Sequence, residues 1–458
     1  MAVFPIEIFA LIAKEVTSSA DLLHLSLCSS SIHKEIYHTL YYRLEIQSSV
    51  KLKKLARLLY ARPDLAIKVK HITVVGRCHA FSSSEGFPAC ETLAPHVSSH
   101  SDHLPYKLKE DLQLRDFLAQ IRAGDQDYTR HWSQIMPSTT WDGYCAILLS
   151  ILPSLRSIDI TIPFKGSQTH GRHAQDLPYV FGYRNSQGGH LGYYVDTYRT
   201  MDILKAMSSV GYPDPQAQSH GAEVTDLSIR GEFMCGAYQT DGDQAYSSIV
   251  AADVLPIAAG FKKLHRLTLG NTTFKKDLRR GITPAMAMSL KHLELTSPYV
   301  TNHNDRWSIL EILNPLESLV IKLGHAKNTT MPATIGDRPI NGKELSRALS
   351  FHHSSLLTLK IYYFDCVLAG ELREAQPPMD WSGFEGLRRL EAPMNFFSMG
   401  CVLTNLSSSA GRAKTVGEVV QSLPECFEEL VISRWNGPEG FEETLKESLP
   451  RCKVVLKW

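Results

Sequence analysis

The phrase Leu-x-x-Leu-x-Leu, with another apolar residue at some leucine positions, recurs along most of this sequence and constrains its fold more than any other feature. Its eight copies occupy residues 155–160, 224–229, 264–269, 290–295, 316–321, 356–361, 387–392 and 427–432. Apolar residues at alternate positions predict a short strand with its apolar side chains on one face. Because one such unit cannot bury its apolar face alone, neighbouring copies are expected to stack.

The spacing of the phrase indicates a repeat architecture. Leu264, Leu290 and Leu316 follow one another in steps of 26 residues, inside the range of about 20 to 29 residues that is typical of leucine-rich repeats. Later steps of 40, 31 and 40 residues indicate inserted loops. We therefore expect an α/β fold, a leucine-rich-repeat solenoid with parallel strands on the concave side and helices outside. The alternative is that leucine alternation arises in an unrelated α/β protein.

The expected solenoid covers residues 69–458 and has irregular parts. Apolar stretches at 250–259 and 342–349 predict helices of the outer wall, and 452–458 predicts a last strand. Polar segments without periodicity predict surface insertions. These insertions lie near residues 82–103, 166–198 and 325–340.

Strand alternation also predicts one recognition surface. If the leucines face the core, the residues between them face the opposite, concave side. The residues assigned to this target-binding face are Arg266, Thr268, His292, Glu294, Ser318, Val320, Thr358, Lys360, Arg389 and Glu391. Their charged, hydroxyl and imidazole groups suit protein recognition, although solvated residues without a role would look the same. The Tyr-rich segment 179–198 is the rival contact site.

The first forty residues carry three short helical patterns. Pro5 suits a helix start, and serines at positions 18, 19 and 29–31 separate the patterns as caps. Apolar residues of the first pattern cover an arc of about 200°, twice the stripe that packing on one core needs. Because so short a segment cannot bury a core of its own, a partner is expected. The alternative is a plain amphipathic cap on the following domain.

This stretch resembles an F-box, the helical motif that docks a substrate receptor onto the Skp-type adaptor of a cullin-RING ubiquitin ligase. The matching residues are Phe4-Pro5, Glu7-Ile8, Asp21-Leu22-Leu23 and Leu25-Ser26-Leu27. Phe4 and Ile32 stand where the family usually has Leu and Trp or Phe, and both keep these positions apolar. Residues 40–69 are similar to the segment that joins the F-box to leucine-rich repeats in proteins of filamentous fungi.

The resemblance implies a domain order and a function. Residues 1–45 would be the F-box, 46–68 a helical linker, and the remainder the repeats. The chain would be a substrate receptor of a Skp-cullin-F-box ubiquitin ligase, joined through the adaptor to cullin and a RING protein, with the repeats binding an unknown target for ubiquitination and proteasomal degradation. Adaptor contacts would be made by Phe4, Pro5, Ile8, Phe9, Ile12, Leu22, Leu25, Leu27 and Ile32. The alternative is a leucine-rich-repeat scaffold that binds the adaptor without ligase activity.

Composition narrows the partners and the compartment. The 48 basic and 47 acidic residues leave a net charge of +1, and no basic block indicates nucleic acid as the main partner. The sequence shows no secretory leader and no apolar run of the length that a membrane span needs. Nine cysteines without a regular framework fit a reducing compartment. The expected location is the cytoplasm, the nucleus or both.

A third alternative is a hydrolase or a metal protein whose site lies in the insertions. The sequence contains no Gly-x-Ser-x-Gly elbow, phosphate-binding loop or dinucleotide fingerprint. Cysteine and histidine candidates lack the paired spacing of zinc ligands, and the aspartates lack the series of a calcium loop. The candidates are Cys78, Cys90, His96, His100, His103, His170, His173, Asp241, Asp243, His352 and His353. We expect a non-catalytic protein without cofactor or metal.

Overall fold

The computed structural model describes part of the chain. The described residues are 5–16, 18–47, 49–75, 141–162, 199–208, 221–231, 249–270, 272–274, 289–296, 299–300, 307–323, 342–363, 379, 381, 383–393, 397, 417, 420–421, 423–424, 427–433 and 441–457. Several sequence-based candidates lie outside them, namely Phe4, Cys78, Cys90, His96, His100, His103, His170, His173, Asp241, Asp243, the tyrosine-rich segment 179–198 and the insertions near 82–103, 166–198 and 325–340.

The described residues fall into two compact units. The first holds those up to Leu227 together with Gly260–Lys263, and the second holds the others from Ser228 onward. Helices and strands of the first unit are α1 (Ile6–Glu15), α2 (Ser19–Leu27), α3 (Ser30–Leu40), β1 (Arg43–Ile46), α4 (Ser49–Ala61), α5 (Pro63–Ala66), β2 (His71–Val74), α9 (Trp141–Ser150), β3 (Ser157–Ile162) and α10 (Arg199–Met207). Strand β4 (Asp226–Gly231) lies across the division.

The second unit continues the alternation of strands and helices. Its elements are β5 (Ile249–Val250), α12 (Ala251–Gly260), β6 (Arg266–Gly270), β7 (Thr272–Phe274), β8 (His292–Thr296), β9 (Tyr299–Val300), α14 (Ser308–Ile312), β10 (Ser318–Leu323), α15 (Gly342–Leu349), the 3₁₀ turn Ser350–His352, β11 (Thr358–Tyr363), β12 (Arg389–Pro393), β13 (Glu429–Ser433), α17 (Phe441–Ser448) and β14 (Lys453–Lys457). The helices predicted at 250–259 and 342–349 and the last strand are confirmed.

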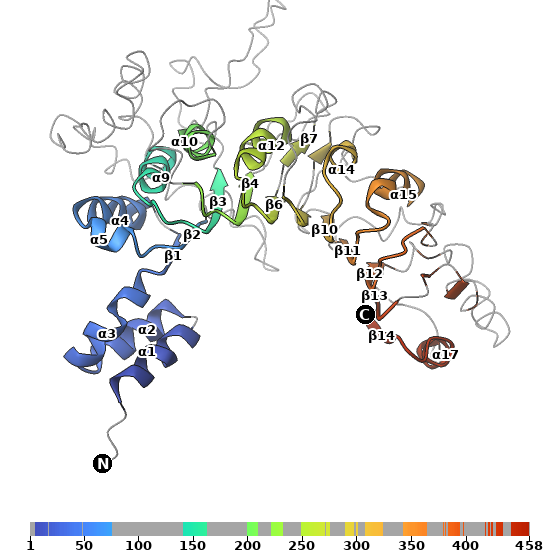
Figure 1. The fold of residues 1–458 in the computed structure, drawn as a ribbon, viewed down its shortest axis with the longest axis horizontal. Coiled ribbons are helices and arrows are strands. Elements are labelled where there is room, and N and C mark those ends of the chain that lie inside the picture. The colour runs from blue at the N-terminus through green and yellow to red at the C-terminus, as the bar shows by residue number, and fades with distance from the viewer. Residues whose placement is uncertain are drawn as a thin grey trace, which may run out of the picture. The chain divides into compact units, whose positions relative to one another are not determined.

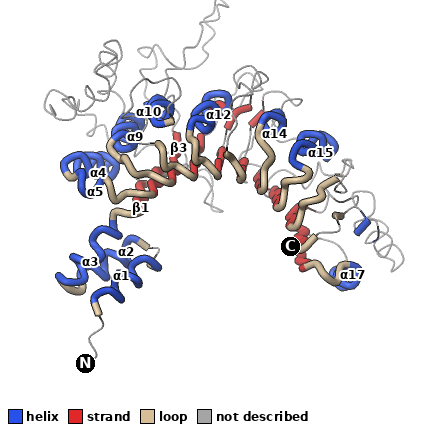
Figure 2. The backbone as a smooth tube through the Cα atoms, in the orientation of Figure 1, coloured by secondary structure: helices blue, strands red, loops and turns tan. Residues whose placement is uncertain are grey.

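The fold is mixed α/β with one open parallel sheet. Within the described residues, eleven strands pair in the order β1-β2-β3-β4-β6-β8-β10-β11-β12-β13-β14, and β5, β7 and β9 form a second, small sheet. In the second unit, helices α12, α14 and α15 lie on one side of the large sheet (Figure 1). Figure 2 shows the same one-sided arrangement of α4, α9 and α10 in the first unit. Strands whose side chains alternate between apolar and polar have one apolar face, so helices are required only on that side of the sheet.

Register places the repeated leucines side by side. Leu293 of β8 lies opposite Leu267 of β6 and opposite Leu319 of β10. These three side chains are at most 1% exposed. The predicted phase of the strands is therefore confirmed, because one-residue slips would have turned these leucines to the other face.

Serine side chains join consecutive copies of the phrase at equivalent positions. Ser289, directly before Leu290, donates its hydroxyl to the carbonyl of Leu264 at 2.8 Å. Ser355, directly before Leu356, donates in the same way to the carbonyl of Leu316 at 2.8 Å. In these two copies the repetition thus extends beyond the apolar residues to a polar contact that satisfies a backbone acceptor of the preceding copy.

The sheet begins earlier than the sequence indicated. The predicted boundary placed residues 1–45 in a helical domain and 46–68 in a helical linker. Instead, Arg43–Ile46 forms β1 and pairs in parallel with His71–Val74. Leu44 and Ile46 alternate with two charged residues and are 8% and 2% exposed, so this segment follows the strand rule of the later repeats.

Candidate functional sites

The three N-terminal helices form a small bundle around α3, which packs against both α1 and α2. Ser18 accepts a hydrogen bond from the Asp21 backbone N–H at 3.3 Å, and Ser29 accepts one from that of Ile32 at 3.1 Å. These caps satisfy backbone donors that the first turn of a helix leaves free. The expectation that serines separate the helices is confirmed.

The core of this bundle consists of few side chains. Ala13, Leu22 and Ile36 are buried in it, and partly buried apolar residues surround them, namely Phe9, Val16, Leu25, Ile32 and Leu40. Leu22 is therefore a core residue of the bundle, with 7% exposure. Its assignment to the adaptor-binding set stays a prediction, and most of its side chain is used inside the bundle.

Other apolar side chains of the bundle face solvent. Leu11 is 61% exposed and Ile12 45% exposed on α1, while Leu23 and Leu27 on α2 are 49% and 71% exposed. Leu23 and Leu27 are four residues apart and share one helix face. The helices thus present apolar surface that their own core does not use.

The remaining residues of the predicted adaptor-binding set differ in exposure. Ile12 and Leu27 are exposed, and Pro5 is exposed at the start of α1. Ile8, Phe9, Leu25 and Ile32 are half-buried. Sequence reasoning missed Leu11 and Leu23, although the i, i+4 spacing of Leu23 and Leu27 was a usable signal.

A polar cluster joins α3 to the turn before α5. Arg62 donates to both carboxylate oxygens of Asp64 at 2.9 and 2.8 Å and to the Tyr37 hydroxyl at 3.0 Å. The hydrogen bonds from Arg62 lower the pKa of the Asp64 carboxyl, and Asp64 raises the pKa of the guanidinium. The charged forms are thus favoured, and Tyr37 ties the bundle to the segment that follows it.

The second candidate site is the polar face of the sheet, which we define as the strand residues that alternate with the buried leucines. All ten predicted residues lie on it. Register arranges them in two rows across β6, β8, β10, β11 and β12: Arg266, His292, Ser318, Thr358 and Arg389, then Thr268, Glu294, Val320, Lys360 and Glu391. The sequence therefore predicted which residues share this face.

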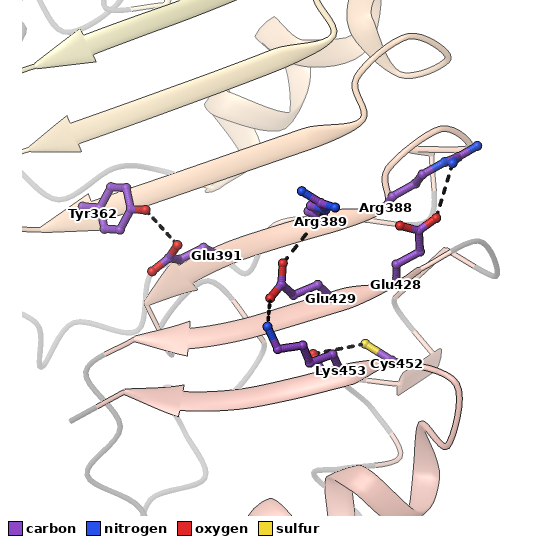
Figure 3. Close-up of polar contacts among 8 residues, drawn as sticks. All are labelled: Tyr362, Arg388, Arg389, Glu391, Glu428, Glu429, Cys452 and Lys453. Atoms are coloured by element: carbon purple, nitrogen blue, oxygen red, sulfur yellow. Dashed lines mark hydrogen bonds and ion pairs between the residues drawn. The ribbon is translucent and has the colours of Figure 1, made fainter. Parts of the chain in front are cut away.

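One of the ten is buried. Glu391 is only 5% exposed, because the Tyr362 hydroxyl donates to its Oε2 at 2.7 Å (Figure 3) and Lys457 Nζ donates to its Oε1. A buried carboxylate needs such partners to offset its lost hydration. Burial and the bond to Glu391 together raise the pKa of Tyr362, so the phenol stays a donor. Glu391 therefore holds Tyr362 and Lys457 in place on this face, and its assignment to the target-binding set stays a prediction.

A second carboxylate lies one strand further along. Glu429 of β13 accepts from Lys453 of β14 at 2.7 Å, and the Arg389 Nε lies 4.0 Å from its other oxygen (Figure 3). Its side chain is 28% exposed. The hydrogen bond from Lys453 is the main cause that lowers the pKa of Glu429. The carboxylate thus stays charged near neutral pH.

These groups line a cavity of about 260 Å³ over strands β11 to β14. Its lining residues are Lys360, Arg389, Leu390, Glu391, Glu429, Val431, Lys453, Val455 and Lys457. Sequence reasoning named only Lys360, Arg389 and Glu391 of this set as site residues. The lining residues of β13 and β14 are absent from the predicted set. The sequence indicates both strands, at 427–432 and 452–458, but the predicted polar face does not extend to them.

Two features are absent from the described part of the chain. There, His, Cys, Asp and Glu side chains form no cluster of three that could hold a metal ion, and no helix has the length and apolar character of a membrane span. His352 is buried and engaged with two backbone groups, the N–H of Leu316 and the carbonyl of Leu310.

No protein-family profile matches the chain, and no curated protein is significantly similar to it in sequence.

Proposed function

We propose that this chain is the target-binding subunit of a Skp-cullin-F-box ubiquitin ligase. In this proposal the bundle α1–α3 docks a Skp-type adaptor, and the polar face of the sheet, the strands of a leucine-rich-repeat solenoid, holds the protein to be ubiquitinated. The chain itself performs no chemistry. It accelerates transfer by keeping the target close to the charged carrier, which replaces a bimolecular encounter by an effectively intramolecular one.

The observation that carries the proposal is the apolar surface left on the bundle. Four large aliphatic side chains, Leu11 and Ile12 on α1 and Leu23 and Leu27 on α2, are 45% to 71% exposed, and both helices pack against α3. Covering one such side chain completely contributes about 1.5 to 3 kcal/mol relative to exposure. An apolar partner surface therefore gains most by binding there, and the F-box resemblance of these same helices favours a Skp-type adaptor as that partner.

The test is co-purification of a Skp-type adaptor with the full chain and with a Leu23→Ala, Leu27→Ala variant. Burial of a leucine side chain contributes about 1.5 to 3 kcal/mol, and truncation to Ala removes most of that apolar surface from each of the two positions, so the double variant is expected to bind at least about tenfold more weakly. Both leucines are exposed, hence the bundle should stay folded, as helical circular dichroism would report.

Leu58 provides the matched control. It is an exposed leucine on α4, outside the bundle, with 40% of its surface accessible, and Leu58→Ala should bind the adaptor like the wild type. Equal adaptor binding by the double variant and the wild type would overturn the docking proposal. Adaptor binding without cullin in the complex would instead favour the scaffold alternative, which lacks ligase activity.

A further inference from the structure

The cavity over β11 to β14 carries an inference about the target, and it rests on the proposed role of the polar face. Its polar lining is unequal in charge: Lys360, Arg389, Lys453 and Lys457 are cationic, whereas Glu391 and Glu429 are the two carboxylates. Each carboxylate already has close partners from the same lining. The excess of positive charge is thus left to face the cavity.

Lys360 and Arg389 are the cations with spare capacity. In the described part of the chain Lys360 makes no hydrogen bond or close ion pair, because Glu391, its register partner on β12, is bonded to Tyr362 and Lys457. Its charge acts on Glu429 only as one of the smaller causes that lower the pKa of that carboxyl. Arg389 reaches Glu429 only at 4.0 Å, and its side chain is 60% exposed. Lys360 lies opposite Glu391 and Arg389 opposite Thr358, so the two cations are diagonal neighbours on adjacent strands of one face.

The cavity also has an apolar part. Val431 of β13 and Val455 of β14 lie opposite each other and line it together with Leu390. Its volume of about 260 Å³ lies below the range of about 300 to 1,000 Å³ that is usual for small-molecule sites. The dimensions favour side chains of a peptide over a cofactor or metabolite.

We propose that this cavity binds an acidic segment of the target protein. A glutamate or aspartate carboxylate of that segment pairs with Lys360 and Arg389, and an adjoining aliphatic side chain packs on Val431 and Val455. Arg389 suits a carboxylate because its guanidinium can donate two parallel hydrogen bonds. The surplus cations also attract acidic segments over several ångströms, an effect that salt weakens.

The test measures fluorescence anisotropy of short labelled peptide pools with the full chain. One pool has a fixed Leu-Glu pair, a second has Leu-Gln, a third has Leu-phosphoserine, and all other positions are degenerate and uncharged. The Leu-Glu pool is expected to bind at least about tenfold more tightly than the Leu-Gln pool, the effect of about one charge-assisted hydrogen bond.

Two substitutions test whether the Leu-Glu pool binds in this cavity. Lys360→Gln and Arg389→Gln are each expected to weaken the Leu-Glu pool about tenfold. Lys360→Gln is the cleaner change because it leaves no carboxylate without its partner, and its thermal midpoint should match that of the wild type. Lys446→Gln is the matched control, since it removes a lysine of 52% exposure from helix α17, outside the polar face, and should not change the affinity.

Two outcomes would overturn the proposal: equal binding of the Leu-Glu and Leu-Gln pools, or equal loss of affinity with Lys446→Gln and Lys360→Gln. Binding of the phosphoserine pool alone would overturn the carboxylate assignment. Adaptor co-purification is measured in parallel. If the adaptor fails to bind while the acidic pool binds at Lys360, the ligase proposal is wrong and the acidic-peptide site is retained. If the adaptor binds while the acidic pool does not, only the peptide site is wrong.

Discussion

At the scale of single residues, His352 shows how one buried ring joins neighbouring segments. Its side chain has 0% exposure. The Leu316 backbone N–H donates to Nδ1 at 3.0 Å, and Nε2 donates to the Leu310 carbonyl at 2.8 Å. Both bonds require the neutral ring with its proton on Nε2, because a proton on Nδ1 would face another donor. In sequence, His352 was only a metal candidate without partners.

This arrangement predicts a pH-dependent stability. Burial lowers the pKa of His352 in the folded state, so the unfolded chain, with a histidine pKa near about 6.5, binds more protons as the pH falls. The free energy of unfolding should therefore decrease on acidification below about pH 6.5, by at most about 1.4 kcal/mol per pH unit for this one group.

The measurement is urea unfolding of wild type and His352→Gln between about pH 7.5 and about pH 5.5, compared by slope and not by absolute stability. The variant should show the shallower decline. A residual slope is expected, because burial also lowers the pKa of half-buried His71. Parallel slopes would show that His352 is not the group that titrates.

At the scale of elements, the repeated Leu-x-x-Leu-x-Leu phrase explains why the burial of the strands was predictable from sequence and why the charge network was not. Alternating leucines determine which face of each strand is buried, so the burial of Leu267, Leu293 and Leu319 followed from sequence. The charge network did not, because Glu429 and Lys457 come from strands separated from Arg389 and Glu391 by long insertions. Spacing alone does not say which carboxylate meets which lysine. Similarly, the helical spacing of apolar residues alone does not show that Leu22 is buried in the bundle while Leu23 is exposed.

The strand stack predicts unequal costs for two leucines of the second unit, one buried in β8 and one exposed just before β11. Leu293 is 1% exposed between two leucines in register, whereas Leu357, just before β11, is 38% exposed. Leu293→Ala should lower the free energy of unfolding by about 2 to 5 kcal/mol, since it removes buried methyl groups and leaves a cavity. Leu357→Ala should change it by less than about 1 kcal/mol. Urea denaturation of the two variants checks this, and equal costs would contradict the assigned register.

At the scale of the whole molecule, the residue at which the sheet begins separates the part proposed to dock the adaptor from the part proposed to bind the target. The bundle α1–α3 has a core of its own, and β1 already belongs to the sheet. The Tyr42 carbonyl accepts from the backbone N–H groups of Lys70 and His71. The segment that serves the sheet therefore starts after α3, at residues that the sequence assigned to the helical domain.

Two truncations that differ by seven residues, one lacking 1–40 and one lacking 1–47, test this boundary. The shorter truncation keeps β1 and should retain the urea midpoint of the sheet and the binding of the acidic peptide pool, while adaptor binding is lost. The longer truncation removes Leu44 and Ile46, which are 8% and 2% exposed, and opens the edge of β2. Losing two buried aliphatic side chains costs about 3 to 6 kcal/mol, so its urea midpoint should be clearly lower. Equal midpoints would place β1 outside the cooperative sheet, and adaptor binding by the shorter truncation would exclude the bundle as the docking site.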